Sequence, residues 1–429
     1  MPRRVAGHHM CNIEVPLTAA PSRSDADTRK RRLHADRPFW AATPHISAKH
    51  DRQPPQKDWD VIIVGTGISG ALMAEALTRA KLRVLILDRR TPVRGSSLAS
   101  TAMIQHEIDI PLHQLARQIG LDKAERAWRR SVRAVDDLVA LAKGLKLKCQ
   151  MQPKQALYLT GNEMGQRAMQ VEMEARTAAG IAGEYLNAAD LRARFGIDRT
   201  GAILSSASAS ANPPQLTAGL LAVAQARGAT VVSPAEVTDM AEMAGGVALA
   251  TRRGQIFTAR HVVFCTGYEF LPQMQSRAHR IISTWALASD PGMARPGWLD
   301  DMLVWEAAEP YLYFRTTPDG RIIAGGEDEG DAEAFKDPAK MTANMARIAA
   351  KLEQVCGIRI GTPAYTWAAP FGNTTDGLPI IDAVPGMERV FSVMGFGGNG
   401  ITYSMIAAQI IAARIAGKPD ADADLFAFR

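Results

Sequence analysis

The stretch that decides the fold is "VIIVGTGISGALMAEALTRAKLRVLILDRR", residues 61–90. It opens with a continuous branched apolar run, Val61–Val64, which is typical of a parallel strand buried on both faces. A glycine-rich turn follows, then a helical pattern over Ala71–Arg79 and a second apolar strand over Val84–Leu87. This order predicts a strand–helix–strand unit of about thirty residues.

The turn has the G-x-G-x-x-G spacing of a dinucleotide-binding loop. Gly65 would make the tight turn, Gly67 would let backbone approach a pyrophosphate, and Gly70 would let helix and strand pack closely. The first N–H groups of the helix, those of Ile68 and Ser69, would then be available to the phosphates.

Asp88 ends the second strand, where a carboxylate can accept a hydrogen bond from a ribose 2′-OH. The same carboxylate would repel a 2′-phosphate, so the motif disfavours NADP. The motif does not separate FAD from NAD. A glycine turn without any ligand is the structural alternative.

A second glycine cluster, "MGFGGNGITYS", occupies residues 394–404 and precedes an apolar helical pattern over Ile401–Ala416. The chain from Val390 to Ala413 carries no charge and is long enough to span a membrane. The glycines and Asn399 interrupt this run near its middle. We therefore expect a short strand, a glycine turn and a buried helix, with no membrane span.

Three further stretches bear on the choice of cofactor: "RGSSLASTAMIQHEID" (94–109), "HVVFCTGYE" (261–269) and "DGLPIIDAVPGMERVFSVMGFGGNGITYS" (376–404). Together with the first glycine loop they resemble the D-amino-acid oxidase, glycine oxidase and sarcosine oxidase (DAO) family of FAD-dependent oxidoreductases. The resemblance runs from about Trp59 to Arg429. It implies an α/β fold, with a Rossmann-type FAD-binding domain and an α+β substrate domain built on a mostly antiparallel sheet.

The two domains are expected to be interleaved along the chain. The FAD-binding domain is predicted to comprise 58–106, 200–272 and 366–429, the substrate domain 107–199 and 273–365, and a disordered or surface-lying leader 1–57. Helical patterns cover Leu112–Gly144, Met164–Ala179, Ala188–Phe195 and Pro214–Gly228. Short strands are predicted to dominate from Ile281 to Tyr365.

The resemblance places the late glycine segment at the flavin. Gly397, Gly398, Asn399 and Gly400 would lie at the ring, and the N–H groups of Ile401 and Thr402 near its O2. A helix N-terminus there would stabilise the negative charge of the reduced flavin. The alternative is that these glycines only permit tight helix packing.

The same resemblance assigns the remaining FAD contacts. These are Asp88 and Arg89 at the adenosine ribose, Ser96, Ser97 and Thr101 along the pyrophosphate and ring, Val237 at the adenine, and Thr266 and Gly267 closing the channel. No cysteine stands at the late position that carries covalent flavin in this family, so the FAD is expected to be non-covalent.

The activity that the resemblance implies is oxidation of an amine, an N-substituted amino acid or a D-amino acid, with hydride transfer from the carbon beside the nitrogen to flavin N5. Family members acting on small amino acids hold the carboxylate with arginine. Here "WAAPFGNTTDG" (367–377) has Phe371 in that place, and Ala102 and Gln105 stand where basic residues follow the Gly-Ser-Ser.

The remaining candidate anchor is Arg315, on a predicted strand whose Tyr313 shares its face by the two-residue period. Its alternative role is pairing with a structural carboxylate. His106 is a candidate proton-handling group or a structural histidine. Two competing functions stay open: an NAD-linked dehydrogenase, and a flavin-binding partner subunit without its own turnover. The missing arginines are the reason for the second.

Composition narrows the classes further. The net charge of +6 is accounted for by residues 1–57, which hold 11 Lys/Arg and 5 Asp/Glu. The remainder is neutral, so we expect no nucleic-acid partner. The four cysteines are far apart and form no C-x-x-C, which predicts neither a metal site nor a disulfide framework and suits the cytoplasm. The partner is a small molecule, and the sequence does not indicate an oligomeric state.

Overall fold

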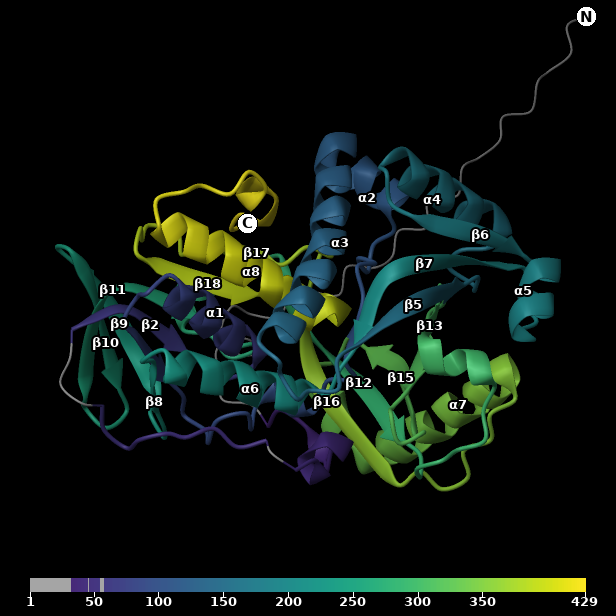
Figure 1. The fold of residues 1–429 in the computed structure, drawn as a ribbon, viewed down its shortest axis with the longest axis horizontal. Coiled ribbons are helices and arrows are strands. Elements are labelled where there is room, and N and C mark those ends of the chain that lie inside the picture. Colours follow the sequence, from purple (N-terminus) through teal and green to yellow (C-terminus); the bar gives the residue numbers. More distant parts are fainter. Residues whose placement is uncertain (1–31, 45, 55–57) are drawn as a thin grey trace, which may run out of the picture.

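The computed structural model describes residues 32–44, 46–54 and 58–429. These residues form two β-sheets with helices packed on them, and α3 (Leu121–Gly144) lies between the two (Figure 1). The expectations for residues 1–31 lie outside the described residues. The mixed α/β fold with a Rossmann-type sheet, as the sequence predicted, is confirmed.

The smaller, eight-stranded sheet carries the first glycine loop. In sheet order its strands are β17 (Ile380–Ala383), β18 (Val390–Met394), β11 (Ile256–Phe264), β2 (Trp59–Val64), β3 (Val84–Leu87) and β8 (Thr230–Val232), with β9 (Val237–Met243) and β10 (Gly246–Thr251) extending from β11. The run β18–β11–β2–β3–β8 is parallel. Its central strands are covered on both faces, which is why β2 and β3 are continuous apolar runs.

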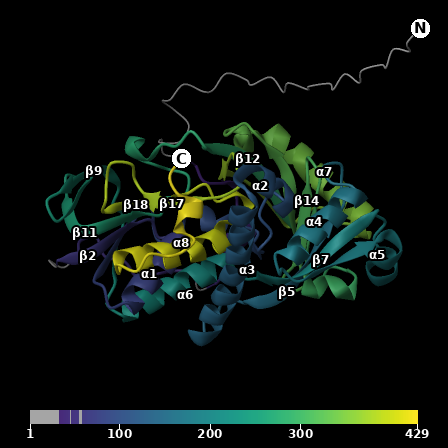
Figure 2. The ribbon, with the colours of Figure 1, turned by 90° about the horizontal axis from the view of Figure 1, so that it is seen from above.

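Three helices cover one face of this sheet, with α1 (Ile68–Arg79) between α6 (Pro213–Ala226) and α8 (Gly400–Ile415) (Figure 2). Val61 and Ile63 of β2 pack against these helices, whereas Ile62 packs against the β9–β10–β11 meander on the other face. This packing brings α1 and α8, more than three hundred residues apart, side by side. Both helices begin at the carboxyl ends of the parallel strands.

The larger sheet has ten strands. In order they are β1 (Ala35–Asp36), β16 (Tyr365–Thr374), β12 (His279–Ala288), β15 (Ile322–Glu329), β14 (Leu312–Thr316), β13 (Met302–Glu306), β5 (Gln152–Leu159), β7 (Gly201–Ser210) and β4 (Met103–Ile104), with β6 (Gly183–Asn187) on β7. All neighbours are antiparallel except β13 and β5. The helices around it are α2 (Leu112–Ile119), α4 (Gln166–Ala178), α5 (Ala188–Phe195) and α7 (Pro338–Cys356).

Helix α7 corrects the expectation that short strands dominate from Ile281 to Tyr365. The side chain of Asp337 caps the helix by accepting from the N–H groups of Ala339 and Lys340, and Pro338 occupies the first turn. Gly357 ends it in the left-handed conformation, with φ of 70°. These start and stop signals are legible in the sequence, and the helix packs on β12 and β15.

Part of the expected leader is folded into the body. β1 pairs with β16, and the Trp40 side chain is only 1% exposed. The Trp40 indole donates to the Ser100 carbonyl at 2.6 Å. An aromatic residue that fills a core position explains why this segment is ordered.

The domain division remains a prediction. Three strands near its boundaries, β4, β7 and β16, fall in segments assigned to the FAD-binding domain but pair within the ten-stranded sheet. No helix in the described part of the chain combines the length and apolar character needed to cross a membrane.

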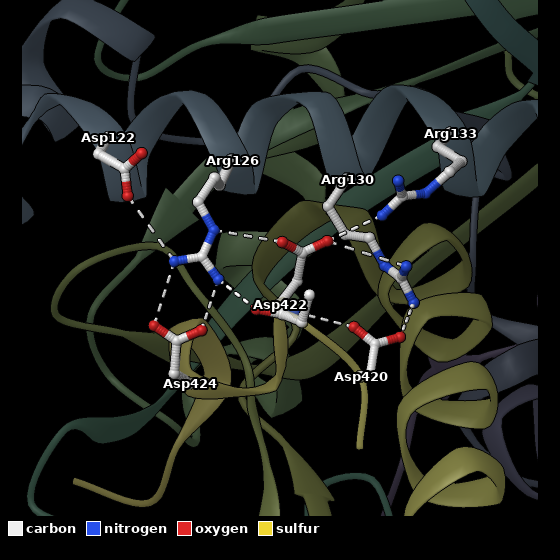
Figure 3. Close-up of polar contacts among 8 residues, drawn as sticks. Asp122, Arg126, Arg130, Arg133, Asp420, Asp422 and Asp424 are labelled. Atoms are coloured by element: carbon white, nitrogen blue, oxygen red, sulfur yellow. Dashed lines mark hydrogen bonds and ion pairs between the residues drawn. The ribbon is translucent and has the colours of Figure 1, made fainter. Parts of the chain in front are cut away.

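Helix α3 holds the segment that follows α8 through an arginine ladder (Figure 3). Arg126, Arg130 and Arg133 lie on one face of α3. Asp422 accepts from Arg126 at 3.3 Å and from Arg133 at 2.8 Å, and lies 3.9 Å from Arg130, which donates to Asp420 at 3.0 Å.

Removing the shared carboxylate should loosen this ladder. We expect Asp422→Asn to lower the free energy of unfolding by about 1 kcal/mol, because it weakens three ion pairs at once and leaves the largely buried Arg130 with fewer partners. Urea unfolding in low and high salt measures this. The effect should shrink in high salt, and Asp290→Asn, at an exposed loop position, is the control.

Candidate active site

A single cavity of about 1000 Å³ joins the two glycine clusters. Gly65 and Gly67 line it from the β2–α1 turn, and Gly397, Gly398 and Gly400 line it from the turn before α8. Its size is at the upper end of the range for ligand sites in proteins. The two segments therefore converge on one space, as the sequence predicted.

The β2–α1 turn needs glycine at each motif position for a different reason. Gly65 has φ of 113°, and a Cβ on it would lie 2.3 Å from the Cys265 carbonyl oxygen. A Cβ on Gly70 would lie 1.9 Å from the Gly65 carbonyl oxygen. Gly67 has an ordinary φ of −73°, and a Cβ on it would meet only Ser97 Oγ, at 3.3 Å. Its lack of a side chain therefore keeps space free in the cavity and is not required by packing in the core.

The start of α1 is open toward the cavity. Its N-cap, Gly67, supplies no side-chain cap. The Ile68 N–H donates to Ser97 Oγ at 3.0 Å, and Ser69 Oγ shares a 2.7 Å hydrogen bond with Ser404 Oγ, one turn into α8. The two helix N-termini, each with a positive dipole end, are thus tied together beside the same cavity.

Asp88 lies at the end of β3 with its carboxylate on the cavity. Its Oδ2 accepts from Thr66 N–H at 2.7 Å and from Thr66 Oγ1 at 2.5 Å, and its Oδ1 accepts from Arg90 N–H at 2.8 Å. Oδ1 therefore keeps a lone pair for one more donor. Burial raises the pKa of this carboxyl.

Asp109 lies against the turn before α8. It accepts from Gly398 N–H at 3.0 Å and from Asn399 Nδ2 at 3.3 Å, and Asn399 Nδ2 also donates to the Glu107 carbonyl at 2.7 Å. The carboxylate opens into the cavity but is otherwise surrounded by protein, which raises its pKa to about 6. The Gly398 N–H partly opposes this rise.

A third group of cavity residues comes from the ten-stranded sheet. Tyr313 of β14 and Tyr311, the residue just before β14, line the cavity with ring centroids 5.7 Å apart. The Tyr311 hydroxyl donates to Asp328 Oδ2 at 2.8 Å, while Asp328 Oδ1 has no hydrogen-bond partner among the described residues. Burial raises the pKa of Asp328 to about 7; the side chains of Thr284 and Tyr311 oppose the rise, and Glu309 and Asp109 add smaller contributions to it.

A β-bulge directs Asp328 into the cavity. Ser283 of β12 pairs with Glu329 and Trp285 with Gly326, so one residue of β12 opposes two residues of β15. Glu327 adopts φ of 59° at this irregularity. A bulge of this kind changes the direction of the side chains beside it.

Two glycines make this bulge and its surroundings possible. A Cβ on Gly326 would lie 2.0 Å from the Tyr311 carbonyl oxygen, and a Cβ on Gly325 would lie 2.3 Å from the Tyr313 hydroxyl. The position of Tyr313 in the cavity therefore depends on glycine at the neighbouring strand.

Comparison with known proteins decides the family. Residues 60–414 match the model of the DAO family, described as FAD dependent oxidoreductase. This chain belongs to the DAO family. It is therefore an FAD-dependent oxidoreductase, which confirms the predicted family and cofactor and sets aside the NAD-linked alternative.

DAO-family relatives cover nearly all of the described chain. It is 24% identical to N-methyl-L-tryptophan oxidase of Escherichia coli O81 over 86% of this chain and 98% of that protein. It is 22% identical to the probable oxidoreductase OrdL of Haemophilus influenzae, over 83% of each. Among solved structures, glycine oxidase from Geobacillus kaustophilus superposes with a TM-score of 0.71 at 20% identity, covering 87% of this chain and 99% of that one.

The cavity residues fit FAD. Gly67 leaves the α1 N-terminus clear for a pyrophosphate, and Asp88 retains a free lone pair for a ribose hydroxyl. Thr266 and Gly267 line the cavity from the end of β11, as a closing segment of a dinucleotide channel would. Each of these features supplies what a bound dinucleotide needs.

Most residues predicted to contact FAD line this cavity. They are Gly65, Gly67, Ile68, Ser69, Asp88, Arg89, Ser96, Ser97, Thr101, Val237, Thr266, Gly267, Gly397, Gly398, Asn399, Gly400 and Ile401. Two predicted contacts, Gly70 and Thr402, do not line it. Gly70 packs on the β2–α1 turn, and Thr402 Oγ1 donates to the Gln105 carbonyl at 2.9 Å. Their direct contact with FAD stays a prediction.

Arg315 does not line the cavity, which corrects its prediction as the substrate anchor. Its guanidinium donates to the carbonyls of Thr101 at 2.7 Å, Thr316 at 2.9 Å and Ala211 at 3.2 Å. Tyr313 shares its strand face, but Arg315 lies about 7 Å farther along β14. It is therefore behind the segment that contains Thr101.

This structural role gives a prediction. Arg315→Met should lower the free energy of unfolding by about 2 to 4 kcal/mol, because three carbonyls lose their donor, while the Michaelis constants for substrates should stay within twofold. Urea unfolding and steady-state kinetics measure the two effects. Arg359→Met, at an exposed position, is the control. A large rise in Michaelis constant with unchanged stability would restore Arg315 as an anchor.

His106 also lies outside the cavity lining, contrary to its candidacy as a proton-handling group. It is fully buried, with Nδ1 3.2 Å from the Ala207 carbonyl oxygen and its ring edge-on to Trp128. Burial lowers its pKa, so it stays neutral in the core. Tyr313 is the one predicted catalytic residue that the structure places on the cavity.

Asp109 and Asp328 are not among the site residues predicted from the sequence. For Asp328 a signal was present: "GGEDEG" (325–330) has two glycines inside a strand pattern, which marks a bulge or close backbone approach. Asp109 lacks such a signal. Its importance arises only because the chain returns, almost three hundred residues later, to place Gly398 beside it.

Proposed function

We propose that this protein oxidises an amine at the carbon–nitrogen bond. The observation that carries the proposal is Asp328, a cavity carboxyl whose pKa is raised to about 7 and which has no basic partner among the described residues. Bound FAD supplies the acceptor for the hydride that leaves the carbon beside the nitrogen. The amine must be neutral to react, because an ammonium nitrogen has no lone pair to assist the departure of hydride.

Asp328 is suited to prepare the substrate. At neutral pH it exchanges a proton with an alkylammonium group, since its pKa lies near the working pH. The Tyr311 hydroxyl fixes the orientation of the carboxylate by donating to Oδ2 at 2.8 Å. Phe371 and Ile282 add apolar surface to the same lining and help to exclude water.

An amine without a carboxylate agrees with this cavity better than an amino acid does. Arg315 is committed to backbone carbonyls, and Phe371 takes the place of the arginine that the family uses for carboxylates. N-substituted and D-amino acids are the second candidate, because N-methyl-L-tryptophan oxidase and glycine oxidase are among the similar proteins.

The test is anaerobic mixing of the purified flavoprotein with a panel of primary and secondary amines, N-methyl amino acids and D-amino acids. Loss of the oxidised flavin absorbance with amines supports the proposal. Loss with amino acids alone supports the second candidate. Loss with none would favour the flavin-binding partner subunit.

A further inference from the structure

The basic side chains that line the cavity all lie on the side of the eight-stranded sheet. Three arginines line the cavity, and all three belong to the eight-stranded sheet, near Asp88. They are Arg89, Arg90 and Arg252. The part of the lining that comes from the ten-stranded sheet and its loops contains several acids but no lysine or arginine.

Four of these carboxyls have no basic side chain within ion-pair distance in the described chain. They are Asp109, Glu163, Glu309 and Asp328. Two others, Glu306 and Glu329, are neutralised by Arg199 at 2.7 Å and by Lys340. We call the four unpaired residues the carboxylate row.

Members of the carboxylate row raise one another's pKa by charge repulsion. Burial is the main cause of the raised pKa of both Asp328 and Glu309. Glu309 and Asp109 add to the rise at Asp328, and Glu163 adds to it at Glu309, where Lys351 opposes it. Such mutual repulsion has a cost that a cation would remove. The row therefore extends from the N-terminus of α8 past the bulge to the loops after β5 and β13.

Independent of charge, two residues of the lining each have a buried side-chain oxygen without a hydrogen-bond partner among the described residues. Gln105 is only 9% exposed and lines the cavity, and its Oε1 has no partner among the described residues. Asp328 Oδ1 is likewise buried and unpartnered. Buried acceptors of this kind are normally satisfied by a donor.

An aromatic wall completes the chamber. Trp305 lines the cavity and stacks on Tyr158, with ring centroids 3.7 Å apart and planes 11° apart. The Tyr158 ring is buried and already has the Arg176 guanidinium 5.9 Å from its centroid, so Trp305 offers the aromatic surface. Aromatic faces beside carboxylates favour organic cations, because the ring face carries partial negative charge.

We propose that the substrate is a diamine or polyamine: an amine that reacts beside Asp328 and carries a second ammonium held by Glu309 and Glu163, with no carboxylate. This inference rests on the proposed amine oxidation. A zwitterionic amino acid would bring its carboxylate among these acids, where no described basic group of the lining can receive it. A second ammonium would instead neutralise the row.

Three compounds of matched length test the proposal: 1,4-diaminobutane, n-butylamine and 4-aminobutanoate. The readouts are the dissociation constant, from perturbation of the oxidised flavin spectrum, and the anaerobic rate of flavin reduction. We expect 1,4-diaminobutane to bind about tenfold or more tightly than n-butylamine, and 4-aminobutanoate to bind most weakly. The preference should fall as salt is raised.

Variants locate the second site. Glu309→Gln and Glu163→Gln should each reduce the ratio of diamine to monoamine affinity by about three- to tenfold. Glu174→Gln, an exposed helix position, should leave the ratio unchanged. A ratio unaffected by both cavity variants, or tighter binding of 4-aminobutanoate, would overturn this inference while leaving amine oxidation intact. Reduction by no amine at all would overturn the proposed function itself.

Discussion

Asp328→Asn is expected to slow anaerobic flavin reduction by amines about 10²- to 10⁴-fold while FAD stays bound, which is the range lost when a positioned acid or base is removed. The asparagine still accepts from Tyr311 but cannot take a proton from the substrate. Rapid mixing followed by flavin absorbance measures the rate. Asp290→Asn, exposed and outside the cavity lining, should behave as wild type.

The rate of flavin reduction should depend on pH through Asp328. Asp328 has a pKa of about 7, so flavin reduction should rise with pH and level off above that value. Asp109, with a pKa of about 6, titrates earlier, and burial keeps Tyr311 and Tyr313 protonated throughout. Asp328→Asn should remove the rise near pH 7. A variant that keeps both the rate and the pH profile would show that Asp328 does not handle the proton.

Stability should move in the opposite direction to activity. The folded pKa of Asp328 is raised above its ordinary 3.8, so the stability linked to its proton is present below pH 4 and is lost as pH rises through about 7. Above pH 7 the asparagine variant should therefore be more stable than wild type, by about 2 kcal/mol. Thermal unfolding at pH 8 measures this and separates loss of catalysis from loss of fold.

The second large effect is expected at the first glycine loop. Gly67→Val should leave the chain folded and reduce its affinity for FAD about 10²-fold or more, because a branched side chain would stand where the pyrophosphate approaches the α1 N-terminus. The fold should survive, since Gly67 has φ of −73° and its Cβ would meet only Ser97 Oγ. The FAD content of the purified protein and its circular dichroism are the two measurements.

Gly165→Val is a closely matched control. Gly165 is the N-cap of α4 with φ of −80° and ψ of −175°, against −73° and −174° for Gly67, and its Cβ would meet nothing within 4 Å. Both variants carry the same cost of valine at a helix N-cap. Full FAD content in Gly67→Val would refute the placement of the pyrophosphate. Gly65→Ala and Gly70→Ala are unsuitable tests, because their Cβ atoms would collide with backbone and disturb folding.

Elements with strong local signals were readable from the sequence. β3 spans Val84–Leu87 and α5 spans Ala188–Phe195, both as predicted. These depend on local rules: a buried apolar run for the strand, and Asn187 as a capping side chain for the helix. The late glycine segment was placed by family resemblance, and the structure brings it to the same cavity.

The amino-acid sequence by itself determined the nucleotide-binding unit and the α/β class, because the glycine spacing and the apolar runs of β2 and β3 follow local rules. The FAD-linked family followed from a resemblance spread over several stretches of the chain. Only the tertiary structure decided what faces the substrate. Arg315 and Tyr313 share a strand face, yet just one reaches the cavity, and Asp328 enters it through a bulge against β12. Which side chains line a cavity depends on how far each lies along its strand and on register between distant strands, and neither is encoded locally.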